Sequence, residues 1–571
     1  MKNLLRGPVG RSHKGGQPQA AWVQKGAAAV GALAATLAGS MASAGQIDTN
    51  SELNLRWDNT FTVTSAFRAQ DASPTKLNDA NSDDPDRNFR GIGTPVVERG
   101  DIYSEVDASW HNFGVRGSAQ GWYDAVYSGQ NDNNSPGTLN SNVANNRDFA
   151  VHTQELNGYK AELMDAFTYG AFDWGEDQRF SFRAGRHTIL WGESLYFPTN
   201  GISAGQAPLD GIKGQLLLNP QSKETFRPVT QLSATYQASL ALSFSAYYQL
   251  GWRSTVIPGV GSYFSTTDVL DQGGDRLYPG HGGAYFARSG SDIKPPDTTG
   301  QFGGAIHYTL GDYDFGGYAL RYSDKTPQLL IRPGITQLAN GQVLVLDPRQ
   351  LNPSNPAQIG TYQLAYARDI EIYGASVTKD IYDINFGFEV SARRNMPLVN
   401  QGSVILPGQQ VDANNHAPWP VGDTLHAQLS YIASLPAQPL IGSDDLNITG
   451  EVAMNHLLEV TKNKQNLSPL VNSTAAAITT VFEPNYRGVR ANLDLAPSLG
   501  VTWNFLGNSP VLGNQVKNTA QLTFGLRATY EQVWKGFIEF QHFIGDNHGN
   551  TALSNGMIGR DFIGLSLQRT F

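Results

Sequence analysis

The sequence predicts an all-β protein: a transmembrane, antiparallel, up-and-down β-barrel of about 18 strands with an inward-folded plug loop. Three observations predict this fold. Apolar and polar residues alternate with a period of two along most of the chain, tight turns alternate with long polar loops, and the chain ends on an alternating strand that closes with Phe571. No run of roughly 20 apolar residues occurs, which excludes a bundle of transmembrane helices. The absence of Cys excludes a disulfide scaffold and thiolate metal sites.

The first 44 residues have the organisation of a secretory signal peptide. Residues 1–25 hold five basic residues and no acid, and residues 26–39 form a short apolar run. Ala42-Ser43-Ala44 then supplies the small residues that signal peptidase accepts. We therefore expect residues 1–44 to be cleaved and residues 45–571 to form a single outer-membrane barrel domain. Cleavage takes the formal net charge from -9 to -14, which argues against binding to nucleic acid.

Period-two alternation identifies strands with one apolar and one polar face. In residues 53–64, apolar side chains at 53, 55, 57, 61 and 63 share one face, and polar side chains occupy the even positions. Similar splits occur in 384–393, 425–431, 447–455 and 521–530. Many of these segments are about ten residues long, which is the length that a tilted strand needs to cross a bilayer.

This pattern yields 18 expected strands, and both chain ends then lie in the periplasm, which requires an even number. Pro497 separates the two least distinct segments, so 16 strands is the alternative. The expected strands are 53–67, 101–111, 113–126, 159–172, 179–190, 228–238, 240–252, 301–310, 314–323, 367–378, 383–394, 423–434, 445–458, 487–494, 497–505, 519–531, 533–544 and 560–571.

Long polar loops and tight turns alternate between these strands, as they do between the extracellular and periplasmic ends of outer-membrane barrels. Tight turns are expected at 311–314 and 379–382. Long loops are expected at 68–99, 128–157, 253–300, 324–366, 396–421 and 461–486.

The last strand, 560–571, ends in Phe571 and resembles the signal by which outer-membrane barrels are recognised for insertion. Arg569 departs from the apolar pattern, although its long stem can snorkel to the membrane interface. A soluble secreted β protein would show the same alternation. The signal peptide, the loop asymmetry and the last strand together favour the bacterial outer membrane, with its lipid as the surrounding partner.

Residues 191–227 are less polar than the other loops and include Leu195, Ile202 and an apolar run at 216–218. An apolar loop is poorly placed in water, and a barrel of this size encloses a lumen that its own side chains cannot fill. We therefore expect this segment, the candidate plug, to fold into the lumen as a constriction. The alternative is an extracellular loop packed on its neighbours.

Three stretches resemble a known family: AELMDAFTYGAF (161–172), FRAGRHTILWGESLYFPTNGI (182–202) and DFIGLSLQRTF (561–571). They resemble the proteobacterial outer-membrane family catalogued as domain of unknown function 1302. The resemblance covers nearly the whole mature chain, and the GR-x4-WGES block is its most specific part. It implies an outer-membrane β-barrel, often associated with the handling of hydrophobic compounds alongside export machinery, and it supplies no catalytic residues.

Charged residues of both signs fall on the polar faces of the strands, where they would line water and set a field that selects solutes. For each of them the alternative role is an ion pair that holds the wall and plug together. The residues expected to face inward are Arg56, Asp58, Glu105, Asp107, Arg116, Glu162, Arg183, Glu371, Glu389, Arg393, Glu451, Arg527, Lys535 and Glu539. The candidate pore and ligand-binding residues are Arg183, Arg186, His187, Trp191, Glu193, Tyr196, Phe197, Glu389, Arg393 and Arg527.

Two further motifs carry less weight. Residues 201–205 match the Gly-x-Ser-x-Gly form of a nucleophile elbow, but the expected strand-turn-helix context is missing, so we expect neither catalytic residues nor an enzyme. The acids Asp79, Asp83, Asp84 and Asp86 could offer oxygen ligands to Ca²⁺, although a solvated surface loop is the favoured interpretation. We expect no cofactor and no metal.

These observations favour an outer-membrane channel that passes small molecules, hydrophobic or aromatic in character. The alternative is a non-conducting outer-membrane component of an envelope export or assembly complex, with an envelope transport protein as its partner.

Overall fold

Antiparallel strands dominate the structure, a computed structural model. It describes residues 45–47, 52–138, 140, 143–216, 218, 221–271, 273–280, 283–290, 292–296, 298–337, 343–345, 354–545 and 555–571. The expected signal peptide, residues 1–44, lies outside these described residues. Within them, no helix is both long enough and apolar enough to cross a membrane.

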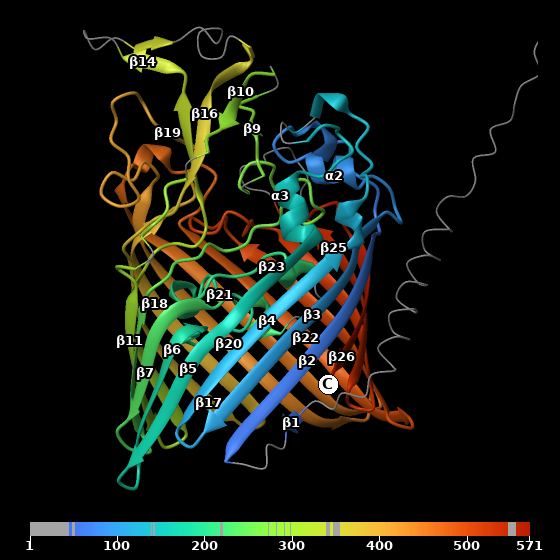
Figure 1. The fold of residues 1–571 in the computed structure, drawn as a ribbon, viewed down its shortest axis with the longest axis vertical. Helices are drawn as coiled ribbons and strands as arrows, with labels where there is room; N and C mark the ends of the chain where they lie inside the picture. Colours follow the sequence, from blue (N-terminus) through green and yellow to red (C-terminus); the bar gives the residue numbers. More distant parts are fainter. Residues whose placement is uncertain are drawn as a thin grey trace, which may run out of the picture. The chain divides into compact units, whose positions relative to one another are not determined.

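Among the described residues, 18 antiparallel strands pair in a closed ring, which confirms the predicted β-barrel and its strand number (Figure 1). A further short strand, β1 (Gly45–Ile47), pairs with the first strand of the ring. The ring consists of β2 (Leu53–Arg68), β3 (Pro95–Trp110), β4 (Phe113–Asp124), β5 (Tyr159–Trp174), β6 (Gln178–His187), β7 (Val229–Gln237), β8 (Leu242–Gln249), β11 (Phe302–Leu310), β12 (Tyr313–Tyr322), β17 (Ile370–Ile381), β18 (Ile384–Pro397), β20 (Val421–Gln438), β21 (Ser443–Lys462), β22 (Thr474–Arg490), β23 (Leu493–Leu506), β24 (Thr519–Tyr530), β25 (Trp534–Ile544) and β26 (Phe562–Thr570).

The ring closes where the first strand pairs with the last. β2 pairs with β26 from Thr60 opposite Thr570 onward, and the ring of Phe571 stacks on that of Phe61 at 5.4 Å. Closure leaves no edge strand in the ring formed by the described residues, so the backbone N–H and C=O groups of neighbouring wall strands pair with each other. The guanidinium of Arg569 lies 4.9 Å from the ring centre of Trp534, a stacked position for the residue that breaks the apolar pattern.

The two faces of the wall differ as the alternation predicts. Apolar side chains such as Trp57, Phe315, Ile538 and Leu565 are exposed on the outer face. Polar side chains of the opposite face are buried; Glu389, for example, is only 2% exposed. An apolar outer band is stable in lipid hydrocarbon, which identifies the ring as a transmembrane barrel.

The two ends of the barrel differ in the length of their connections. At one end, tight turns join neighbouring strands, with positive φ at Gly311, Tyr382 and Asn492. The expected turn at 311–314 is found and is confined to residues 311–312, whereas the turn expected at 379–382 lies at 382–383, because β17 continues to Ile381. At the other end lie α2 (Asp84–Asn88) and α3 (Val151–Thr153) with β9 (Arg276–Leu277), β10 (Tyr285–Arg288), β16 (Gln358–Ala365) and β19 (Ser403–Val404) (Figure 1).

The elements outside the ring are short. A sheet of five strands has the order β19-β13-β16-β10-β9, and β14 pairs with β15. Their bounds are β9 (Arg276–Leu277), β10 (Tyr285–Arg288), β13 (Gln328–Pro333), β14 (Ile335–Gln337), β15 (Val343–Val345), β16 (Gln358–Ala365) and β19 (Ser403–Val404). The helical elements are η1 (Lys76–Asn78), α2 (Asp84–Asn88), η2 (Ala125–Ser128), η3 (Pro136–Thr138), α3 (Val151–Thr153), η4 (Gln154–Gly158), η5 (Ile202–Gly205), α4 (Lys213–Leu216), α5 (Ser222–Thr225) and η6 (Lys464–Asn466).

Three expectations about individual segments are wrong. Most of β22 lies in the expected loop 461–486, because three consecutive alanines at 475–477 interrupt the alternation. Pro497 lies inside β23, opposite Leu526, so it does not end a strand, and the 16-strand alternative fails. Glu371 shares a face with Tyr373, which is 50% exposed, whereas Ile372 on the other face is fully buried, so Glu371 does not face the lumen.

A buried ion cluster ties the long loops to the barrel rim. Asp86 of α2 accepts from Arg68 at 2.7 Å and from Arg560 at 2.8 Å, and all three side chains are fully buried. The same guanidiniums donate to main-chain carbonyls, among them those of Phe89 and Ser265. Burial would raise the pKa of Asp86, but the Arg560 and Arg68 charges outweigh this effect and lower it.

Candidate functional site

Residues 194–197 of the candidate plug are held by one carboxylate of the inner wall. Glu451 of β21 is fully buried and accepts hydrogen bonds from the main-chain N–H groups of Leu195 (2.8 Å), Tyr196 (2.5 Å) and Phe197 (3.1 Å). The hydroxyl of Ser194 donates to its second oxygen at 3.1 Å. Hydrogen bonds to an ionised acceptor are roughly twice as strong as neutral ones, so this carboxylate is a main anchor of the segment.

A second wall carboxylate holds the two ends of residues 193–202, the part of the candidate plug that includes 194–197. Glu389 of β18 accepts from the N–H of Glu193 (2.8 Å) and from the N–H of Ile202 (2.7 Å). Gly192 has a φ of +89°, and a Cβ at this position would lie 2.0 Å from Oε2 of Glu389. The glycine of the WGES block is therefore needed for the close approach of the backbone to the carboxylate.

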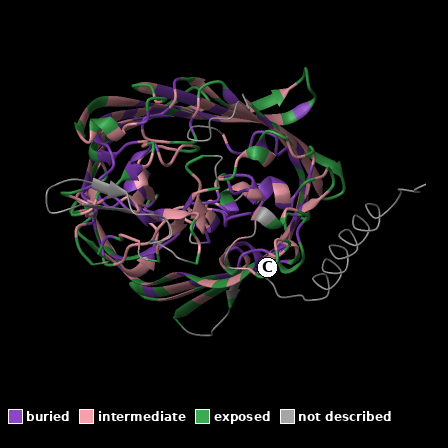
Figure 2. Cartoon of the chain, turned by 90° about the horizontal axis from the view of Figure 1, so that it is seen from above, coloured by how far each residue is buried: buried purple, intermediate pink, exposed green. Residues whose placement is uncertain are grey.

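A wall cation supplies the complementary contacts. Arg393 of β18, which is 1% exposed, donates to the carbonyls of Thr199 (3.1 Å), Asn200 (2.5 Å) and Gly201 (2.9 Å). The Oδ1 atom of Asn200 lies 2.9 Å from Nδ1 of His426, so the segment is fixed from β20 as well. Residues 193–202 therefore lie against the inner faces of three strands, and Figure 2 shows buried non-strand segments within the outline of the ring.

Apolar packing and a buried lysine hold the residues on either side of the segment 193–202. The indole of Trp191 packs against the rings of Tyr247 (5.1 Å) and Tyr318 (6.1 Å). Lys325 follows β12 and donates to the carbonyls of Ala204 (3.3 Å) and Gly205 (3.1 Å). Burial lowers the pKa of Lys325 to about 8.

Six of the candidate residues predicted from the sequence lie in the segment 193–202, next to it, or on the strand β18 that binds it. Glu389 and Arg393 bind main-chain groups, and the side chain of Glu193 accepts from Ser376 at 3.1 Å. The hydroxyl of Tyr196 lies 2.5 Å from Oγ1 of Thr449. The six are Trp191, Glu193, Tyr196, Phe197, Glu389 and Arg393.

Two more candidates, Arg183 and His187, line a cavity of about 410 Å³ beside the anchor. Arg183 is exposed, and its guanidinium lies 5.7 Å from the ring centre of Phe167. His187 is buried, with Nε2 2.8 Å from Oγ of Ser233. The lining residues are Arg116, Met164, Asp165, Phe167, Arg183, His187, Thr188, Leu190, Ser222, Lys223, Phe226 and Pro228.

Positive charge prevails in this cavity. Arg116 pairs with Glu105 at 2.6 Å, and Nζ of Lys223 lies 4.9 Å from the ring centre of Tyr103. Asp165 is the acid among the lining residues. The cavity thus combines cationic side chains with aromatic and aliphatic walls, an arrangement suited to a small apolar molecule that carries an acidic group.

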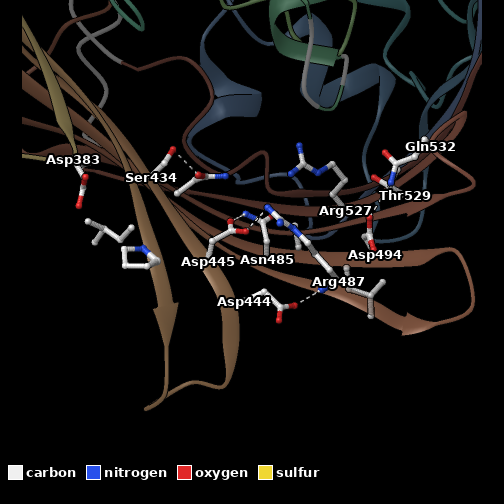
Figure 3. Close-up of a pocket in the computed structure, with 15 residues that line it drawn as sticks. Asp383, Ser434, Asp444, Asp445, Asn485, Arg487, Asp494, Arg527, Thr529 and Gln532 are labelled. Carbon is white, nitrogen blue, oxygen red and sulfur yellow. Dashed lines mark hydrogen bonds and ion pairs between the residues drawn. The ribbon is translucent and has the colours of Figure 1, made fainter. Parts of the chain in front are cut away.

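The remaining two candidates lie elsewhere. Arg186 points to the other face of β6 and donates to the carbonyl of Leu163 at 2.9 Å. Arg527 pairs with Glu483 at 2.6 Å and lines a cavity of about 690 Å³ near the tight turns, where Figure 3 shows it with Asp445 and Arg487.

The sequence motif at 201–205 forms the short helix η5. The hydroxyl of Ser203 donates to the carbonyl of Pro198 at 3.2 Å, which makes it a turn-stabilising group.

Several residues that hold or line the candidate site were not selected from the sequence. Glu451 was expected to face inward but was not selected as a site residue, although the alternation that selected Glu389 applies equally to it. Asn200 and Lys325 gave no signal, because a polar residue in a loop has no periodicity to place it. Phe226 lay inside the expected plug without being singled out.

Comparison with known proteins gives a family and a set of similar structures. A family model described as protein of unknown function (DUF1302) matches residues 25–571. No curated protein matches the sequence. Similar structures include OccAB1 of Acinetobacter baumannii (9% identity, 90% of this chain and 96% of that chain, TM-score 0.42). The outer membrane channel DcaP of Acinetobacter baumannii is also similar (10% identity, 93% of this chain and 100% of that chain, TM-score 0.36). So is a BenF-like porin from Pseudomonas fluorescens Pf-5 (7% identity, 90% of this chain and 98% of that chain, TM-score 0.38).

Proposed function

This chain belongs to the DUF1302 family of proteins of unknown function, and we propose that it is an outer-membrane channel for small molecules. In this proposal the candidate plug narrows the lumen, and solutes pass through the space that it leaves. The observation that carries the proposal is the cavity of about 410 Å³ between the wall and the candidate plug. This volume is within the range of sites for small molecules.

The chemistry of the cavity indicates the class of solute. Phe167, Phe226 and Met164 offer apolar contact to a ring or chain, and Arg183 offers a hydrogen-bonding charge to an acidic group. We propose weak and reversible binding of aromatic or aliphatic carboxylates as they cross. Passage by this mechanism is passive, so the concentration gradient sets its direction.

The first experiment is single-channel conductance of the refolded mature protein in a planar bilayer. Steady ohmic steps would support the channel. Silence from a correctly folded barrel would contradict it and would favour the non-conducting component of an export or assembly complex.

Arg183→Gln is expected to weaken block of the conductance by benzoate at least about tenfold, because a hydrogen bond to a charged group contributes about 1.5–3 kcal/mol. Benzyl alcohol, which has no charge, should block both proteins equally. Arg179→Gln is the matched control, since Arg179 lies on the same strand and pairs with Asp173 at 3.5 Å. Equal block of the wild-type protein and Arg183→Gln by benzoate would rule out this site.

A further inference from the structure

Three carboxylates from two distant loops meet at the long-loop end of the barrel. Asp83 and Asp84 belong to the connection after β2, and Asp268 belongs to the connection after β8. One oxygen from each lies within 4.8 Å of the others. Two oxygens bound to a common Ca²⁺ at about 2.4 Å can be at most about 4.8 Å apart, so this spacing fits a shared ion.

The grouping differs from the acidic cluster visible in the sequence. Asp86 is taken up by Arg68 and Arg560, and Asp79 accepts from the hydroxyl of Ser82 at 2.6 Å. Asp83 and Asp84 remain, and the chain brings Asp268 to them.

A second observation concerns Asp268 alone. Its side chain is 7% exposed, and its Oδ1 atom is buried without a hydrogen-bond donor in the described part of the chain. The other oxygen, Oδ2, accepts from the main-chain N–H of Asp84 at 3.3 Å. A buried carboxylate oxygen with no donor is costly unless something binds it, and a cation is the group that a cluster of anions would bind.

The charges around the cluster leave room for a divalent ion. A cavity of about 580 Å³ is lined by these three acids and by Asp275, Arg87 and Arg276. Arg87 pairs with Asp83 at 2.6 Å, and Arg276 lies 3.6 Å from Asp275. Among the residues that line this cavity, four acids and two arginines have a formal charge of two negatives when ionised, which one divalent cation would neutralise.

We propose that Asp83, Asp84 and Asp268 bind a Ca²⁺ ion that clamps the connection after β2 to the connection after β8. All three ligand atoms are carboxylate oxygens, which Ca²⁺ and Mg²⁺ both prefer. Their irregular arrangement on two loops suits Ca²⁺ better than Mg²⁺, which requires a near-ideal octahedron of ligands. The ion would stabilise the two connections against each other.

The test is terbium luminescence of the refolded full-length mature protein, after removal of divalent ions with EDTA. Tb³⁺ occupies calcium sites, and Tyr278 and Tyr285, which line the same cavity, can sensitise its emission. We expect a saturable signal that Ca²⁺ displaces at submillimolar concentration and Mg²⁺ displaces at least tenfold less well, in the affinity range of extracellular calcium sites. A signal that Ca²⁺ does not displace, or that does not saturate, would overturn the proposal.

Two variants separate binding from folding. Asp268→Asn should lower Ca²⁺ affinity at least tenfold, whereas Asp71→Asn, an exposed residue of the loop after β2, should leave it unchanged. In EDTA, Asp268→Asn should melt at the same temperature as the wild type or higher, because it removes charge repulsion, but it should gain no stability from added Ca²⁺. Lower stability in EDTA, or wild-type Ca²⁺ affinity, would show that Asp268 has a purely structural role.

Discussion

Glu451→Ala is expected to raise the single-channel conductance severalfold. The substitution leaves three main-chain N–H groups and the hydroxyl of Ser194 without their acceptor. A hydrogen bond to a charged group contributes about 1.5–3 kcal/mol, so loss of these four should let residues 194–197 leave the wall and widen the path. The measurement is conductance in a planar bilayer, together with the ion selectivity of the open state.

Glu539→Ala provides the matched control for this change. Glu539 lies on the inner face of β25 and accepts from Gln541 at 2.5 Å, a contact within the wall. Its removal should change selectivity slightly and leave the size of the conductance step intact. If Glu451→Ala and Glu539→Ala conduct alike, the candidate plug does not limit the path.

Asp86→Ala is expected to cause the largest loss of stability. It leaves the guanidiniums of Arg68 and Arg560 buried without a carboxylate, and breaking a buried pair by removing one partner costs about 3–5 kcal/mol. The measurements are the urea midpoint and protease cleavage of the long loops. Asp71→Ala, an exposed change in the same loop, should have a small effect.

The pH dependence of this contribution follows from the lowered pKa of Asp86. A carboxyl with a folded-state pKa below its unfolded value stabilises the folded state above the unfolded pKa and loses this effect as the pH falls through the folded pKa. The difference in stability between the wild type and Asp86→Ala should therefore persist at neutral pH and shrink only under strongly acidic conditions. A difference that shrinks already between pH 7 and pH 5 would argue against this ion cluster.

The barrel could be predicted from the sequence because alternation reports directly on the two faces of a strand. β22 escaped because alanines at 475–477 suit both faces. Glu389 and Arg393 were placed on the inner face by the same alternation, but their partners could not be found. These partners are main-chain groups of residues 193–202, and backbone donors have no sequence signature.

Contacts between loops that are distant in the sequence could not be predicted either. Asp268 joins Asp83 and Asp84 only because the connections after β2 and β8 lie side by side in the folded chain. Period-two patterns place residues on a face but do not say which loops touch.

The wall holds the segment 193–202 mainly by its backbone. Glu389, Arg393 and Glu451 bind main-chain groups, whereas the side chains of Leu195 and Tyr196 remain 44% and 38% exposed. Exchange of the Leu195 side chain leaves these main-chain contacts intact, and exchange of Tyr196 removes only the contact of its hydroxyl with Oγ1 of Thr449. The lumen can therefore acquire new solute preferences, by evolution or by engineering, on a backbone that keeps its position.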